Sequence, residues 1–242
     1  AMIAHLQNIR QIYYPLTIEN GYLPTPASLE RLVTARTKVL VINSPSNPVG
    51  SIIGRKQMAE LLAFATAHDL WVISDEVYDQ INFTDDFVSA GAVGAQDRVI
   101  GVYSFSKTYA MTGWRVGYVA VPESLAEVTA KMQEPLISCI SSVSQQAAVA
   151  ALTGPQGYVS EMVAAYRSRR DDVCEIFTKA GIDFFRPSGA FYIWLDISAS
   201  GQSSREFALE LIREKQVAVA PGSAFGAIGD DHVRISLAAL SR

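Results

Sequence analysis

Residues 38–75 read KVLVINSPSNPVGSIIGRKQMAELLAFATAHDLWVISD, and they carry the pattern from which we predict the fold class. The apolar run at 38–43 (KVLVIN) predicts a buried strand, and the turn-forming residues NSPSNPVG follow it. Residues 55–68 have apolar side chains at helical spacing, and LWVIS at 70–74 predicts a second buried strand. A strand, a helix and a strand in this order are typical of neighbouring parallel strands.

The same pattern continues towards the C-terminus. Residues 98–103 (RVIGVY) predict a third strand, and residues 118–121 predict a short fourth strand. Pro122 suits the first turn of a helix that runs through residue 131. Strands that alternate with helices predict an α/β fold, with a mostly parallel sheet and helices on both faces.

From about residue 141 the pattern changes to two helices and then to a mixture of strands and helices. The predicted helices cover 142–152, 155–180 and 203–215, and the predicted strands cover 191–196, 217–220 and 232–237. A long helix that leads into a small α+β unit indicates a domain boundary. We therefore predict that residues 1–159 belong to a large domain and that residues 160–242 form a smaller C-terminal domain.

The composition narrows the class of protein. Hydrophobic residues make up 49% of the 242 residues and charged residues 18%, which is typical of a globular protein with a substantial core. A formal net charge of −4 argues against a general nucleic-acid binder. Cys139 and Cys174 lie far apart and the three histidines are scattered, so we expect neither a disulfide framework nor a metal site. The sequence lacks a run of ~20 apolar residues and a signal-peptide pattern, and we expect a cytoplasmic protein without a membrane partner.

The most informative stretch, YSFSKTYAMTGWRVG, covers residues 103–117 and begins where a predicted strand ends. The carboxyl ends of strands are where open α/β sheets build their sites. The hydroxyls of Ser104 and Ser106 and the guanidinium of Arg115 suit a phosphate dianion. Lys107 could form a Schiff base with an aldehyde. The alternative is a surface lysine after a strand, with the serines as a helix cap.

Polar residues also follow the two preceding strands. Asp75 leaves a buried strand in SDEVY (74–78), where a carboxylate needs a cationic partner such as a protonated pyridine nitrogen. Tyr78 can face the same side on a turn or a helix start, and Asn47 lies in the rigid turn NSPSNPVG. The alternatives are a helix N-cap at Asp75, with Glu76 in the first turn, and a plain β–α connection around Asn47.

The three blocks occur in order, and each ends a predicted parallel strand. SNPVG (46–50), SDEVYD (74–79) and SFSKTYAMTGWRVGY (104–118) resemble the signature blocks of the class I and II aminotransferases. These are the aspartate-aminotransferase-like branch of the fold type I enzymes that depend on pyridoxal phosphate. The resemblance runs along essentially the whole chain, including PSGAFY (187–192) and PGSAFG (221–226).

The resemblance implies a role for each matching residue around the cofactor. Lys107 is expected to bind pyridoxal phosphate covalently as a Schiff base and then to move the substrate proton. Asp75 is expected to pair with the pyridine nitrogen, and Tyr78 and Asn47 to hydrogen-bond the phenolic oxygen of the ring. The phosphate group is assigned by the same resemblance to Ser104, Ser106 and Arg115.

Substrate binding is assigned to residues nearer the C-terminus as well. The resemblance implies that Arg234, in HVRISL (232–237), binds the substrate α-carboxylate in a fork geometry, beside Asn47. Phe191 is expected to line the substrate pocket. Without the resemblance, Arg234 reads as a surface residue of an edge strand and Phe191 as a core aromatic residue.

The resemblance therefore predicts an aminotransferase that moves an amino group between an L-amino acid and a 2-oxo acid by a ping-pong Schiff-base mechanism. It also implies a homodimer. One alternative is a pyridoxal-phosphate-dependent C–S lyase or similar elimination enzyme, which uses the same residue types. The other is an aminotransferase-like effector domain of a transcription regulator.

Two departures from the family pattern concern the ends of the chain. Family members normally begin well before the equivalent of Ala1, and they continue into a helix after the strand that carries Arg234. The loop and helix start that complete the phosphate site, and the aromatic residue that stacks on the ring, belong to the earlier segment. We therefore expect this chain to bind the cofactor more weakly than a full-length version does.

Overall fold

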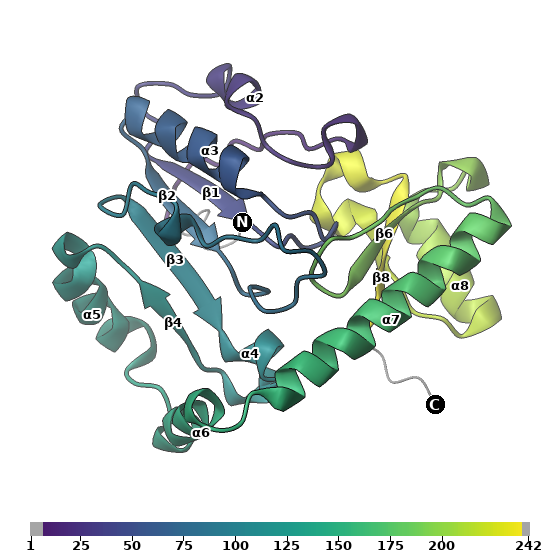
Figure 1. Cartoon of the computed structure of the whole chain (residues 1–242). Coiled ribbons are helices and arrows are strands. Elements are labelled where there is room, and N and C mark those ends of the chain that lie inside the picture. Colours follow the sequence, from purple (N-terminus) through teal and green to yellow (C-terminus); the bar gives the residue numbers. More distant parts are fainter. Residues whose placement is uncertain (1–6, 239–242) are drawn as a thin grey trace.

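The computed structural model describes residues 7–238, and a four-stranded sheet is the centre of their first half (Figure 1). Its strands are β1 (Val39–Asn43), β2 (Trp71–Asp75), β3 (Val99–Ser104) and β4 (Gly117–Ala120), in this spatial order. The pairs β1–β2 and β2–β3 are parallel, whereas β4 runs antiparallel to β3. The predicted mostly parallel sheet is confirmed.

Helix α3 (Arg55–Ala67) covers one face of this sheet (Figure 1). Along β1 buried and exposed residues alternate, and the buried Leu40 and Ile42 pack in one cluster with Met58 and Leu61 of α3. Alternation places every second side chain on the same face of a strand. Full burial of one such side chain stabilises the fold by roughly 1.5–3 kcal/mol, so this cluster fixes the position of β1 under the helix.

A second, smaller sheet lies in the last third of the chain. Its strands are β5 (Phe184–Phe185), β6 (Tyr192–Asp196), β7 (Ala220–Pro221) and β8 (His232–Ser236), in the order β5-β6-β8-β7. All of its pairs are antiparallel. This sheet and the first one are built from separate parts of the chain. The predicted division at residues 159 and 160, which falls inside a helix, stays a prediction.

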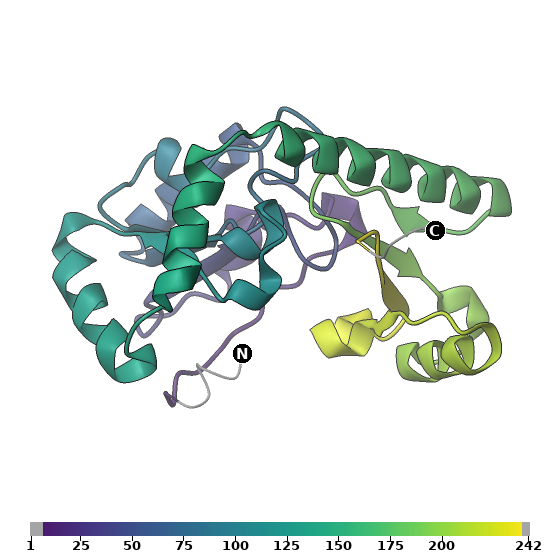
Figure 2. The same ribbon diagram turned by 90° about the horizontal axis from the view of Figure 1, so that it is seen from below.

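Further helices connect and cover the two sheets. They are α2 (Pro26–Glu30), α4 (Phe105–Thr108), α5 (Glu123–Ile137), α6 (Ser142–Thr153), α7 (Gly157–Ala180) and α8 (Ser204–Lys215). Single 3-10 turns cover Ile18–Asn20, Ala90–Ala92, Thr112–Trp114, Ser198–Ser200, Gly222–Phe225 and Ala227–Gly229. Both views show that α7 leaves the neighbourhood of α6 and runs along the second sheet (Figures 1 and 2). Within residues 7–238 no helix is both long and apolar enough to cross a membrane.

The second sheet buries one face against α7 and α8 and turns the other towards the first half of the chain. Ile193 of β6 packs in a cluster with residues of α7, and Leu195 packs with Phe207 of α8. Side chains alternate along a strand, and Trp194 lies on the other face in a cluster with Val49 of the first half. This second face therefore meets the turn that follows β1.

The boundaries of two predicted elements were wrong. The strand expected at 217–220 is reduced to β7, whose pairing with β8 begins only at Ala220. The helix expected to end at residue 131 continues to Ile137 and contains Pro135. Neither β5 nor α2 was predicted, because a two-residue strand and a five-residue helix are too short to show a period.

The two halves of the chain are joined by backbone hydrogen bonds of residues 188–190. The Gly50 carbonyl accepts from the N–H groups of Ser188 and Gly189, both at 2.9 Å, and the N–H of Ala190 donates to Ile81 at 2.8 Å. A Cβ atom on Gly189 would lie 2.8 Å from the Pro45 Cβ atom and 3.0 Å from the Ile81 carbonyl oxygen. Only a residue without a side chain allows this approach.

We predict that Gly189→Ala lowers the free energy of unfolding by about 1–3 kcal/mol, because the added methyl group overpacks a backbone contact. Urea denaturation measures the change. Gly91→Ala is the matched control, since a Cβ atom there meets nothing within 4 Å. Equal effects of the two substitutions would show that the approach at Gly189 does not limit stability.

Candidate active site

The candidate residues follow the carboxyl ends of three parallel strands. Asn43 ends β1 opposite Asp75, which ends β2 opposite Val102 of β3, so the three ends lie side by side. Asn47 follows β1 by four residues, and Lys107 follows Ser104, the last residue of β3, by three. The parallel register therefore brings all of these side chains to one edge of the sheet, as the strand pattern predicted.

Side-chain hydrogen bonds of Asn43 connect the turn after β1 with the end of β2. Its side-chain nitrogen donates to the Asp75 carbonyl at 3.0 Å. Its side-chain oxygen accepts from the backbone N–H of Asn47 at 2.8 Å. Asn43 was not among the predicted site residues, although its position as the polar residue that ends an apolar strand was visible in the sequence.

Asp75 is half-buried and has no cationic partner among the described residues. Its carboxylate accepts only the N–H of Val77, at 3.3 Å, and forms no ion pair with any of residues 7–238. Burial raises the pKa of Asp75 above its usual value. Turns rather than a helix follow it, so the N-cap interpretation is wrong. A partly desolvated carboxylate without a counter-charge suits a ligand that carries a positive charge.

Glu76, beside Asp75, faces the interior instead. Its Oε1 atom accepts from the Ser74 hydroxyl at 2.8 Å and from the N–H of Ala90 at 2.9 Å, and the side chain is fully buried. The expected place of Glu76 in the first turn of a helix is therefore also wrong. The two neighbouring carboxylates have different surroundings, and only Asp75 is available at the edge of the sheet.

Lys107 lies between two aromatic side chains. It belongs to the short helix α4, whose N-cap Ser104 accepts from the N–H of Ser106 at 3.1 Å. The Lys107 ammonium nitrogen is 5.8 Å from the ring centre of Tyr78 and 5.7 Å from that of Phe191. Among the described residues it forms no ion pair with a carboxylate. Lys107 is half-buried, which contradicts the alternative of a surface lysine, whereas Ser104 does cap the helix.

A chain of side-chain contacts connects Tyr78 with Arg234 and Asn47. The hydroxyls of Tyr78 and Tyr192 are 3.1 Å apart. The Tyr192 ring centre is 4.2 Å from the guanidinium carbon of Arg234, whose Nη1 atom donates to the Asn47 side chain at 2.8 Å. Burial raises the pKa of Tyr78. Arg234 is thus not a surface residue on an edge strand, and Tyr192 is a site residue that sequence analysis missed.

The predicted phosphate-binding residues share one segment after β3. Ser106 is buried, and its side-chain hydroxyl makes no hydrogen bond to another described residue. The Arg115 guanidinium is exposed and donates to the Thr112 carbonyl at 2.9 Å, and the Thr112 hydroxyl donates to the Ser106 carbonyl at 3.2 Å. Thr112 therefore ties the turn of Arg115 to α4. In the described part of the chain, no hydrogen bond or ion pair joins Arg115 to Lys107, Asp75 or Arg234.

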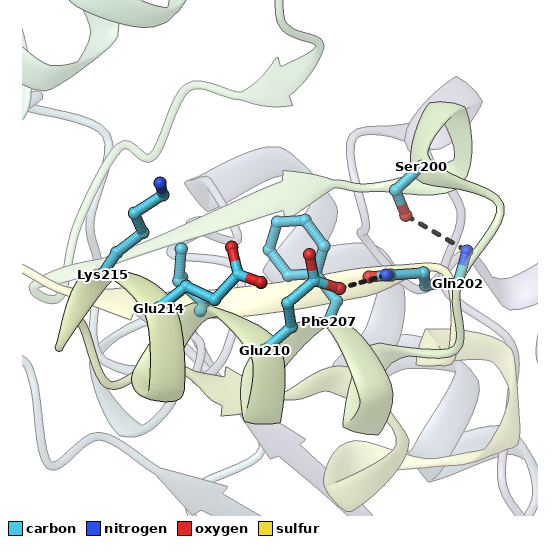
Figure 3. Close-up of a pocket in the computed structure, with 7 residues that line it drawn as sticks. Ser200, Gln202, Phe207, Glu210, Glu214 and Lys215 are labelled. Carbon is cyan, nitrogen blue, oxygen red and sulfur yellow. Dashed lines mark hydrogen bonds between the residues drawn. The ribbon is translucent and has the colours of Figure 1, made fainter.

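A pocket elsewhere on the surface involves none of these residues. It lies against α8 and is lined by Ser200, Gln202, Phe207, Glu210, Leu211, Glu214 and Lys215 (Figure 3). Within residues 7–238 no three His, Cys, Asp or Glu side chains are grouped to hold a metal ion. The candidate site is the edge of the first sheet, where the strand register brings the predicted residues together.

Comparisons with known proteins place the chain in one family. The family model described as aminotransferase class I and II matches residues 1–242. Aspartate aminotransferase of Pyrococcus abyssi is 41% identical over 95% of this chain and 60% of its own length. Aromatic-amino-acid aminotransferase 2 of Thermococcus litoralis is 38% identical, with the same coverage. A solved structure of a Thermus thermophilus aspartate aminotransferase double mutant matches with a TM-score of 0.93 at 33% identity, over 98% of this chain and 62% of that one.

These matches confirm the predicted α/β fold class and the resemblance on which the residue roles were based. The chain spans about 60% of the length of the curated relatives reported above.

We predict that Asp75→Asn changes the pH dependence of stability. Because the pKa of Asp75 is raised in the folded chain, the folded state keeps this proton at a pH where the unfolded state has lost it. Asp75 therefore lowers stability as the pH rises from its ordinary pKa of 3.8 through the higher folded value. The free energy of unfolding of the Asp75→Asn chain, relative to the unchanged chain, should increase over this range. Denaturation at a series of pH values measures it, with exposed Asp85→Asn as the control; a relative stability that stays constant or falls would contradict the prediction.

Proposed function

Because this chain belongs to the aminotransferase class I and II family, we propose that it transfers an amino group between an L-amino acid and a 2-oxo acid, with pyridoxal phosphate as cofactor. The observation that carries the proposal is the contact chain at the edge of the first sheet. It connects Lys107 through Tyr78 and Tyr192 to Arg234 and Asn47. An amine, a phenol and a guanidinium from three distant parts of the sequence thereby face one small region.

The residues at this edge fit the cofactor. Asp75 forms no ion pair within residues 7–238 and suits a protonated pyridine nitrogen, while the Ser104 and Ser106 hydroxyls and the Arg115 guanidinium suit a phosphate. Tyr78 would hydrogen-bond the phenolic oxygen of the ring. When bound, pyridoxal phosphate supplies an electron sink for the negative charge that develops at the substrate Cα atom.

Lys107 carries the covalent and the acid–base chemistry. Its amine would hold the cofactor covalently. When free, the same amine, at the end of α4, could remove the proton from the substrate Cα atom and later return a proton to the product. A base positioned in this way typically contributes ~10²–10⁴ in rate.

Arg234 and Asn47 orient the substrate. Asn47 accepts from Nη1 of Arg234, while the Nε atom is buried without a partner and Nη2 makes no hydrogen bond to a described residue. A carboxylate can accept two parallel hydrogen bonds from one edge of a guanidinium. The edge of the Arg234 guanidinium that carries Nε and Nη2 therefore suits the α-carboxylate of an amino acid. The same arginine can bind the carboxylate of the 2-oxo acid in the second half of the reaction.

We also propose that the protein acts as a homodimer and that residues 1–159 and 160–242 are its two domains. The names of the relatives include aspartate and aromatic amino-acid aminotransferases, so these two classes of amino donor are the first substrates to test.

The central prediction concerns the modified lysine. When the chain is incubated with pyridoxal phosphate and reduced with borohydride, we expect one phosphopyridoxyl group on Lys107, located by peptide mass spectrometry. Lys107→Ala should abolish it, and Lys131→Ala, at an exposed lysine paired with Glu127, should not. Adducts that are spread over exposed lysines and persist in the Lys107→Ala chain would refute the proposed site.

Product analysis tests the reaction class. An amino donor and 2-oxoglutarate should yield glutamate and the matching 2-oxo acid. Pyruvate and ammonia formed from a cysteine-type substrate, without amino-group exchange, would point to an elimination enzyme instead.

A further inference from the structure

Two aromatic rings contact the guanidinium of Arg234. The guanidinium carbon is 4.2 Å from the ring centre of Tyr192 in β6 and 4.8 Å from that of Phe225, at the end of the turn Gly222–Phe225. Both distances are within the range of favourable cation–π contacts. We name Tyr192 and Phe225 the aromatic bracket. Neither residue was assigned to the cofactor or the substrate from the sequence.

The strand register explains how Tyr192 reaches Arg234. Arg234 of β8 lies opposite Trp194 of β6, and Tyr192 is two residues before Trp194 on the same face. Diagonal neighbours on an antiparallel pair are within reach of aromatic and long side chains. The position of this ring is therefore set by the sheet itself.

Phe225 is partly exposed, but contacts with other rings support its position. Its ring packs edge-on against the ring of Trp194 at 5.7 Å, and Trp194 in turn stacks on His232 at 5.1 Å. Trp194 is buried. The packing against Trp194 thus fixes the orientation in which the Phe225 ring contacts Arg234.

Tyr192 also contacts the proposed cofactor side of the site. Its hydroxyl is 3.1 Å from that of Tyr78, and Tyr78 is one of the two rings beside the Lys107 ammonium group. A single side chain therefore contacts both the arginine that suits a carboxylate and the phenol that suits the cofactor ring.

We propose that Tyr192 and Phe225 are positioning residues that hold the Arg234 guanidinium in one orientation for a carboxylate, with Asn47 fixing the Nη1 end. An arginine side chain loses rotamer entropy when it is ordered. A guanidinium that is already ordered before the ligand arrives binds more tightly, because this cost is not incurred during binding. The inference rests on the proposed function, since the carboxylate is that of its substrates.

The first test observes Arg234 directly in the ligand-free chain by ¹H–¹⁵N NMR of arginine Nε–H groups. The signal that disappears in Arg234→Lys belongs to Arg234. We expect it to be resolved from the averaged signals of mobile arginines. Tyr192→Leu and Phe225→Leu should each move it towards those averaged signals. Tyr192→Phe, which keeps the ring, and Tyr13→Leu, the same exchange at a residue 75% exposed, should leave it in place.

The second test measures the affinity of the same chains for succinate, a simple dicarboxylate, by following the Arg234 signal or by calorimetry. Loss of either ring should raise the dissociation constant about 3- to 30-fold, the range of one cation–π contact. Tyr192→Phe should change it less than Tyr192→Leu. Phe225→Leu removes a partly exposed ring, so it remains informative if Tyr192→Leu fails to fold.

The outcomes separate this inference from the proposed function. An Arg234 signal already averaged in the unchanged chain, or unaffected by loss of either ring, would overturn the aromatic bracket. Unchanged succinate affinity in both leucine variants would do the same. If borohydride reduction gave no selective phosphopyridoxyl group on Lys107, that result would instead count against the proposed function, whatever the orientation of the Arg234 guanidinium.

Discussion

The parallel register of β1, β2 and β3 is the constraint on which the rest of the structure depends. Asn43, Asp75 and Val102 are matched across the three strands. Because parallel strands align their carboxyl ends, the polar residues that follow the strands lie at the same edge of the sheet. The helix α3 makes this possible, since its apolar face covers Leu40 and Ile42 and leaves the strand ends free. A slip by one residue would exchange the two faces of a strand and turn Asp75 away from its neighbours.

The second requirement is a close backbone approach between the two halves of the chain. Residues 188–190 bond to Gly50 and Ile81, and this brings the following residues, Phe191 and Tyr192, next to Tyr78. The same approach allows Arg234 to reach Asn47, 187 residues earlier in the chain. Each contact at the site thus depends on a tertiary interface as well as on a strand end.

Two charged side chains at the edge of the first sheet, Asp75 and Arg234, have polar atoms without a partner among the described residues. Asp75 has no ion-pair partner among the described residues, and burial raises its pKa. The Nε atom of Arg234 is buried and has no hydrogen-bond partner among residues 7–238. Inside the fold, Glu76 has two donors on Oε1, whereas its Oε2 atom is buried without a partner in the same part of the chain. Unpaired polar groups lower stability, so the unpaired groups of Asp75 and Arg234 favour a functional site at this edge.

Much of this was readable from the residues alone, and the reason is local. Apolar runs of KVLVIN and LWVIS type specify strands, and a polar residue shortly after such a run lies at a strand end wherever the strand is placed, so Asn47, Asp75 and Lys107 could be named as candidates. Arg234 and Phe191 were assigned only through resemblance, because nothing local distinguishes them from an edge-strand arginine and a core aromatic residue. Tyr192, Phe225 and Asn43 became visible only in the tertiary structure. Their roles depend on the pairing of β6 with β8 and on the approach of residues 188–190 to Gly50, and such contacts between distant segments leave no periodic signal in the chain.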